Sequence, residues 1–112
     1  MKSSPRRGDV FGAKLDLARG TEIRKTRPAV IVSNYSFNRH GARVIVLPIT
    51  GNVESLYPGE AMIEVQGSPE RVLGDQMRSL DKSCLGSRIG TLSPAELSAV
   101  EEAILITLGF QP

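Results

Sequence analysis

The chain has 112 residues, 40% of them hydrophobic, which is the size of one compact domain and leaves no room for a second. Its single cysteine, Cys84, excludes an intrachain disulfide, and no apolar run reaches the ~18 residues that a membrane helix needs. Because the N-terminus also lacks the pattern of a secretory signal, we expect a cytoplasmic protein that does not enter the membrane.

The net charge is only +2, but the basic residues are unevenly placed. Arg6 and Arg7 form one cluster, and a second lies in residues 19–27, where Glu22 is the only acid. A basic patch of this kind attracts phosphate groups, although such charges are more often an ordinary solvated surface. A small domain without a disulfide would also gain stability by associating with a second copy.

The first 33 residues predict a tail, two strands and a loop. Residues 1–5 are small and polar and end in proline, so we expect a flexible N-terminal tail, followed by a single domain over residues 6–112. Apolar residues alternate with polar ones in 10–17, which predicts a half-buried strand. Residues 18–26 are polar and carry most of the second basic cluster, which indicates a loop. Pro28 then opens an apolar run over 29–33, as expected for a strand that begins at a proline.

The middle of the chain predicts further short strands. Residues 34–41 favour a turn, and the nearly continuous apolar run 43–49 predicts a strand in which Pro48 suggests a bulge or a sheet edge. A second loop is expected over 51–60, a short strand over 61–65, and a break at 67–69. Residues 71–81 predict one bent strand or two short strands divided at Gly74, and residues 88–92 close the β region.

The C-terminal segment predicts a helix. Ser93 can cap its start, Pro94 suits the first helical position, and Glu96 can complete a capping box. One apolar stripe, expected to lie in the core, contains Leu97, Val100, Ile104 and Leu108. Gly109 is a suitable end. Several short strands followed by one helix predict a mainly β fold, a small β-barrel with a C-terminal helix packed on it.

Several common kinds of site lack the residues that they need. The only histidine, His40, lies in a turn-rich segment, so a two-histidine ribonuclease, a histidine-based triad and a multi-histidine metal site are disfavoured. Cys84 has no CxxC partner, and the glycines form neither a dinucleotide-binding nor a P-loop pattern. We therefore expect neither a metal nor another cofactor.

Arginines, hydroxyls and carboxylates on loops and strand ends are left as candidates for chemistry. They are Glu22, Arg27, Ser33, Thr50, Gln76, Arg78 and Ser79. An arginine fork matches two phosphate oxygens, and a hydroxyl can donate a hydrogen bond to phosphate without a metal. Purely structural roles are the alternative, because Arg27 could be an exposed strand-end charge and Thr50 a turn residue that bonds its own backbone.

Five short motifs, in order and at the right spacing, resemble those of the MazF/PemK toxins. They are Arg7-Gly8-Asp9-Val10, Gly20-Thr21-Glu22, Arg27-Pro28-Ala29-Val30-Ile31-Val32, Leu47-Pro48-Ile49-Thr50 and Gly74-Asp75-Gln76-Met77-Arg78-Ser79-Leu80-Asp81-Lys82. The resemblance covers residues 6–110. Thr21 stands where serine is common in the family and Ile23 where a polar residue is common, which bears on loop contacts and sequence preference more than on catalysis.

The resemblance implies a small SH3-like barrel of the CcdB/PemK type and a homodimer. It also implies a metal-independent endoribonuclease that cuts single-stranded RNA at short sequences, leaves 2′,3′-cyclic phosphate and 5′-hydroxyl ends, and is neutralised by an antitoxin. The inhibitory part of the antitoxin is expected to be acidic and flexible, because it would compete for a basic groove.

Site residues carry over by position. Arg27 and Thr50 become the catalytic pair, with Glu22 as a third contributor that either acts as the base or orients Arg27. The expected RNA-contacting or supporting residues are Arg24, Lys25, Ser33, Gln76, Arg78 and Ser79. Two alternatives stay open: a CcdB-like toxin that poisons DNA gyrase without cleaving anything, and a nonenzymatic barrel that binds nucleic acid.

Overall fold

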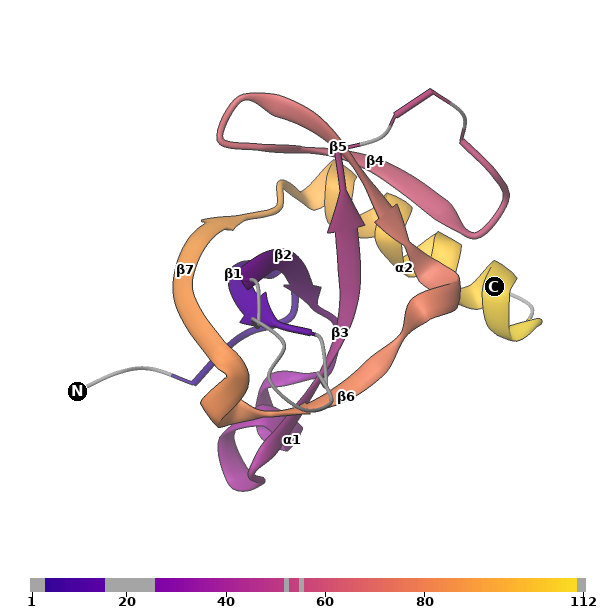
Figure 1. Cartoon of the computed structure of the whole chain (residues 1–112). Helices are drawn as coiled ribbons and strands as arrows, with labels where there is room; N and C mark the ends of the chain where they lie inside the picture. Colours follow the sequence, from indigo (N-terminus) through magenta and orange to yellow (C-terminus); the bar gives the residue numbers. More distant parts are fainter. Residues whose placement is uncertain (1–3, 16–25, 52, 55, 111–112) are drawn as a thin grey trace, which may run out of the picture.

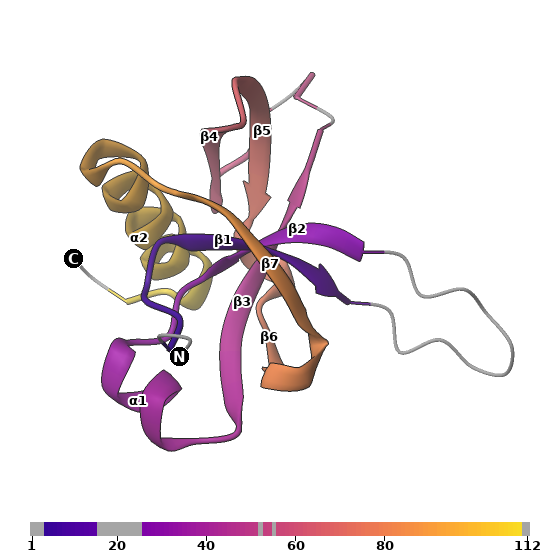
Figure 2. The same cartoon turned by 90° about the vertical axis from the view of Figure 1, so that its left-hand side faces the viewer.

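The structure is a computed structural model that describes residues 4–15, 26–51, 53–54 and 56–110. A curled antiparallel sheet makes up most of the molecule, and the C-terminal helix covers one side of it (Figures 1 and 2). The mainly β fold with a terminal helix is therefore confirmed. Within the described ranges, no helix has both the length and the hydropathy to span a membrane.

The strands are β1 (Asp9–Lys14), β2 (Thr26–Ile31), β3 (Arg43–Thr50), β4 (Glu60–Val65), β5 (Ser68–Leu73), β6 (Arg78–Asp81) and β7 (Leu85–Thr91). They lie in the order β4-β5-β3-β2-β1-β7, and β6 pairs with β3. Strand β3 is the centre of the fold, because its first half pairs with β6, its last two residues pair with β5, and its middle pairs with β2. On one side of β3, Pro48 lies between the residues that pair with β6 and those that pair with β5, where the hydrogen-bonded ladder is already interrupted. On the other side, the register with β2 is regular and shows no bulge at Pro48.

Two hydrophobic clusters occupy the two faces of the sheet. Side chains alternate along a strand, so β2 sends Val30 to one face and Ala29 and Ile31 to the other. The first cluster is closed by helix α2 (Pro94–Leu108), whose Val100 and Ala103 are buried in it. The second cluster lies on the opposite face, and its edge is where the candidate site is found.

Both predicted ends of α2 are confirmed. Ser93 and Glu96 form the capping box, and Gly109 ends the helix with a φ of 80°. The predicted core stripe is wrong at its last position, because the Leu108 side chain is 52% exposed. Leu108 lies at the end of the helix, where it lines an open groove instead of a closed core.

Residues 34–41, expected to form a turn, contain the short helix α1 (Tyr35–His40). The Asn34 side chain caps it by accepting a hydrogen bond from the Phe37 amide, 2.8 Å away. Asn38 is completely buried and donates to the carbonyls of Ser33 and Pro5. Pro5, the last residue of the expected tail, is itself buried.

The segment after β4 also differs from expectation. The turn falls at Gln66 and Gly67, both with positive φ, so Pro69 lies within β5 instead of in a break. On the side away from β4, only the end of β5 pairs with β3, so among the described residues the start of the strand has no partner on that side and proline is tolerated there. The chain then divides at Gly74, where the 3-10 turn η1 (Gly74–Gln76) separates β5 from β6. Of the two alternatives predicted for residues 71–81, two short strands divided at Gly74 are therefore confirmed. A second 3-10 turn, η2 (Lys82–Cys84), leads into β7.

Candidate functional site

One pocket of about 350 Å³ brings together four of the predicted site residues. They are Arg27 from β2, Thr50 from β3, Gln76 from η1 and Arg78 from β6. We call this hollow the arginine pocket. Its apolar lining is formed by Leu15, Pro28, Pro48, Ile49 and Leu73.

Strand pairing explains why Arg27 and Thr50 meet. Strands β2 and β3 are antiparallel, with Ala29 opposite Pro48. Extending this register by two residues places Arg27 opposite Thr50, and residues that lie opposite each other point to the same face of a sheet. The two side chains therefore converge although 22 residues separate them in the sequence.

Arg78 reaches the same face through the other edge of β3. It lies opposite Val46, whose side chain belongs to the second hydrophobic cluster. Gln76 lies just before β6 in η1, which joins β5 to β6 around the end of β3. The arginine pocket is thus built at the edge of the second cluster, where β2, β3, η1 and β6 come together.

The two arginines give this pocket a positive charge. No ion pair found within the described ranges involves Arg27 or Arg78. Arg27 is exposed, and Arg78 is half-buried. A guanidinium in these surroundings keeps its donors available for an anion, and its planar fork is suited to two phosphate oxygens.

Sequence reasoning missed one carboxylate in the arginine pocket. Glu70 on β5 lines it, and a methyl group built on Gly51 would lie 3.9 Å from Glu70 Oε2, directly after Thr50 in the chain. The expected break at residues 67–69 hid the start of β5, so Glu70 had no predicted face. Recognising Gln66-Gly67 as a hairpin turn would have placed Glu70 on a strand paired with residues 61–65.

Ser33 lies elsewhere. It is buried, its Oγ accepts from the Ile45 amide at 2.9 Å, and the same hydroxyl donates to Asn38 Oδ1. These contacts tie α1 to β3, so the structure places Ser33 in a buried hydrogen-bond network outside the arginine pocket.

Ser79 also lies outside the arginine pocket. It follows Arg78 in β6, so its side chain leaves the opposite face of the strand. Arg43 donates to it twice, from Nε to Oγ at 2.7 Å and from Nη2 to the carbonyl at 3.1 Å. These bonds give Ser79 a structural partner on that face.

Other predicted residues fall outside the described ranges or outside this pocket. Glu22, Arg24 and Lys25 belong to residues 16–25, which the structure does not describe, so their roles stay predictions. Cys84 is half-buried against the second hydrophobic cluster, and His40 Nδ1 lies 2.9 Å from the Ser36 carbonyl at the exposed end of α1. Among the described residues, no three His, Cys, Asp or Glu side chains are grouped as a metal site would require.

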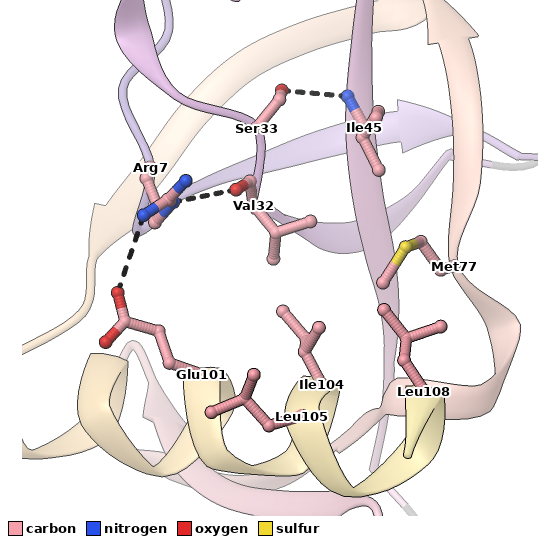
Figure 3. Close-up of a pocket in the computed structure, with 9 residues that line it drawn as sticks. All are labelled: Arg7, Val32, Ser33, Ile45, Met77, Glu101, Ile104, Leu105 and Leu108. Carbon is pink, nitrogen blue, oxygen red and sulfur yellow. Dashed lines mark hydrogen bonds and ion pairs between the residues drawn. The ribbon is translucent and has the colours of Figure 1, made fainter. Parts of the chain in front are cut away.

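A second hollow, which we call the helix groove, lies between α2 and the sheet (Figure 3). It measures about 460 Å³, and α2 directs Ile104, Leu105 and Leu108 into it (Figure 3). The facing apolar residues are Val32, Ile45 and Met77. At one rim Arg7 pairs with Glu101 at 3.7 Å. This groove is mainly apolar, in contrast to the arginine pocket.

Comparison with known proteins agrees with this architecture. A family model described as "PemK-like, MazF-like toxin of type II toxin-antitoxin system" matches residues 6–108. The protein Endoribonuclease MazF9 of Mycobacterium tuberculosis is 34% identical over 112 residues, which cover 92% of this chain and 95% of that protein.

Solved structures show the same fold. A mycobacterial endoribonuclease in complex with its cognate antitoxin superimposes with a TM-score of 0.79 at 28% identity, covering 97% of this chain and 99% of that one. MazF from Deinococcus radiodurans gives a TM-score of 0.81 at 24% identity, covering 97% and 100% of the two chains. The extent of the family match, which takes in both core clusters and every residue of the arginine pocket, shows that the chain belongs to the PemK-like, MazF-like toxins of type II toxin–antitoxin systems.

Proposed function

We propose that this protein is a sequence-specific endoribonuclease toxin that cleaves single-stranded RNA in the arginine pocket. The observation that carries the proposal is the convergence of Arg27 and Thr50, from two strand ends, in one hollow that Arg78 also lines. The printed name of the M. tuberculosis relative, an endoribonuclease, supports the same activity.

Arg27 holds the scissile phosphate in this mechanism. Its guanidinium donates to two phosphate oxygens while the neighbouring 2′-hydroxyl attacks the phosphorus in line, and the Thr50 hydroxyl donates to a non-bridging oxygen. The O2′–P bond forms as the P–O5′ bond breaks, and the proton lost from the 2′-hydroxyl is balanced by one gained at the 5′-oxygen. The products are a 2′,3′-cyclic phosphate and a 5′-hydroxyl, and no step requires a metal ion.

Charge stabilisation is the main duty of Arg27. An arginine side chain stays protonated at neutral pH, so it is poorly matched to accept a proton there. Glu22 is retained as the candidate base or as the residue that orients Arg27. Arg78 and Gln76 line the same pocket and supply donors for a neighbouring phosphate or base.

We further propose a homodimer and an antitoxin partner for this chain in the cytoplasm. The helix groove supports the dimer, because Ile104, Leu105 and Leu108 would be removed from water by a second copy. The charge of the arginine pocket supports an antitoxin with an acidic, flexible segment. A mycobacterial relative has been solved with its cognate antitoxin.

Cleavage of a long RNA in excess chelator tests the function. The wild type should give fragments with cyclic-phosphate and 5′-hydroxyl ends, and Arg27→Ala should lower the rate by about 10²–10³-fold with the fold intact. Intact RNA with the wild type would instead favour a gyrase poison or a simple nucleic-acid-binding barrel.

A further inference from the structure

A second pocket adjoins the arginine pocket. It measures about 400 Å³, and we call it the hairpin pocket because Val65, Gln66 and Ser68 of the β4–β5 hairpin line it. Arg27, with its neighbour Pro28, lines both pockets, and so does Glu70. A group bound in the hairpin pocket would therefore lie beside the guanidinium that we assign to the scissile phosphate.

The lining of the hairpin pocket suits a flat ring with a polar edge. Pro28, Val65 and Ile89 provide apolar walls. The polar groups come from Thr26, Gln66, Ser68 and Glu70. Small-molecule sites combine apolar walls with a few placed polar groups, and bases of single-stranded RNA are read in this way along their edges. Arg27 and Glu70 line both pockets, but Arg78 lines only the arginine pocket, so the hairpin pocket offers a phosphate less positive charge.

Glu70 is the acidic residue in the lining of the hairpin pocket. Within the described part of the chain its side chain takes part in no ion pair and no side-chain hydrogen bond, so its oxygens remain available as acceptors. An ionised carboxylate can only accept. Guanine presents N1–H and its 2-amino group as two parallel donors. Uracil presents one N–H between two carbonyl oxygens that would repel a carboxylate, and adenine and cytosine present one amino group beside a ring acceptor.

We propose that the hairpin pocket binds a guanine that flanks the scissile phosphate, and that Glu70 accepts from its N1–H and 2-amino groups. The inference rests on the proposed ribonuclease function and adds the base that it selects. Glu70 is a specificity residue in this scheme, because it contacts the base and not the reacting phosphorus.

Guanosine-to-inosine substitution tests the contact directly, because inosine lacks only the 2-amino group. Short RNAs carrying guanosine, inosine, adenosine or uridine on either side of the cleaved bond are compared for the wild type, Glu70→Gln and Glu64→Gln. Glu64 is the matched control, since its side chain is exposed on the same hairpin and lines neither pocket.

At one flanking position, kcat/KM of the wild type should fall about tenfold from guanosine to inosine, the loss expected for one buried charge-assisted hydrogen bond. Glu70→Gln, which can no longer accept two bonds, should cleave the guanosine and inosine substrates at similar rates. Glu64→Gln should keep the wild-type ratio of kcat/KM for guanosine to that for inosine. Ser68→Tyr, which would fill the pocket from its rim, should also reduce the ratio, with folding of each variant checked by thermal denaturation.

The outcomes separate the two proposals. The guanine subsite would be overturned if the wild type showed no preference for guanosine on either side of the cleaved bond. It would also be overturned if Glu70→Gln kept the wild-type ratio of kcat/KM for guanosine to that for inosine. Either result would leave the ribonuclease function standing. Failure of the wild type to cut any RNA would overturn both.

Discussion

Arg27 and Thr50 face each other across the ends of β2 and β3, two residues beyond the paired Ala29 and Pro48. The pair lies past the end of the regular hydrogen-bonded ladder but still on the same face of the sheet. The strands therefore fix where both side chains start, and both side chains line the arginine pocket. A rigid sheet is well suited to hold two catalytic groups at a constant separation.

The first prediction concerns the hydroxyl of Thr50. Thr50→Val keeps the shape of the side chain but removes the donor, so kcat for RNA cleavage should fall by about 10²–10³-fold, as when one preorganised donor is lost. Thr50→Ser keeps the hydroxyl and should retain most of the activity. The measurement is single-turnover cleavage at saturating protein, with thermal denaturation to confirm folding. Equal rates for the Val and Ser variants would remove Thr50 from the mechanism.

The second prediction concerns Arg78, whose charge we assign to a neighbouring phosphate. Neutralising one phosphate contact to single-stranded nucleic acid changes the slope of log K against log salt by about 0.7. Arg78→Gln should therefore bind a cleavage-resistant RNA more weakly and with a slope shallower by this amount. Arg39→Gln is the matched control, because Arg39 is exposed on α1 and lines none of the pockets described above. An unchanged slope for Arg78→Gln would mean that Arg78 contacts no phosphate.

Much of this site was predictable, because its position depends on strand patterns that are easy to read. The apolar run ending at Thr50 is nearly continuous, and the run after Pro28 is equally plain, so both strand ends were located. Arg27, Thr50, Gln76 and Arg78 were named from sequence and the fold brings them together. Their convergence could not be derived from composition, since it depends on the register between β2, β3 and β6.

The features that were missed share a physical cause, which is that short elements and packing depend on the rest of the fold. Helix α1 has six residues, too few for an apolar period, and its place is set by the burial of Asn38. Pro69 resembled a break because the free edge that tolerates it exists only after β5 has paired. Leu108 fits the helical stripe, but nothing within the described chain covers it.

The third prediction concerns acid stability and Glu96. Burial raises the pKa of this carboxyl, but hydrogen bonds from the Ser93 and Glu64 amides outweigh burial and leave the pKa below its ordinary value of 4.5. The unfolded chain thus binds a proton more readily than the folded one, so this contribution is full above about pH 4.5 and is lost as the pH falls through the folded pKa.

Glu96→Gln removes this titration. The free energy of unfolding, measured in urea between pH 2 and pH 6, should therefore depend less steeply on pH for the variant than for the wild type below pH 4.5. Glu102→Gln changes an exposed residue on the same helix and should keep the wild-type dependence of the free energy of unfolding on pH. The same slope in Glu96→Gln as in the wild type would show that Glu96 does not couple folding to pH.

The last prediction links the fold to the site through Gly74, the first residue of η1. Its amide donates to the Gly59 carbonyl at 3.0 Å, and a methyl group added at Gly74 would lie only 2.2 Å from that same oxygen. The obstacle is backbone, which cannot swing aside, so Gly74→Ala should destabilise the protein by about 1–3 kcal/mol, the usual cost of overpacking. Because Gln76 enters the arginine pocket from the same turn, RNA binding should weaken as well.

Gly90→Ala is the control, since an added methyl group there meets nothing within 4 Å. Its free energy of unfolding should stay within about 0.5 kcal/mol of the wild type. Urea denaturation of both variants, with binding of the cleavage-resistant RNA, gives the two readouts. If Gly74→Ala were as stable as Gly90→Ala, the contact between η1 and Gly59 could not be the constraint that places Gln76. If it were destabilised yet bound RNA normally, the position of η1 would matter for folding and not for the pocket.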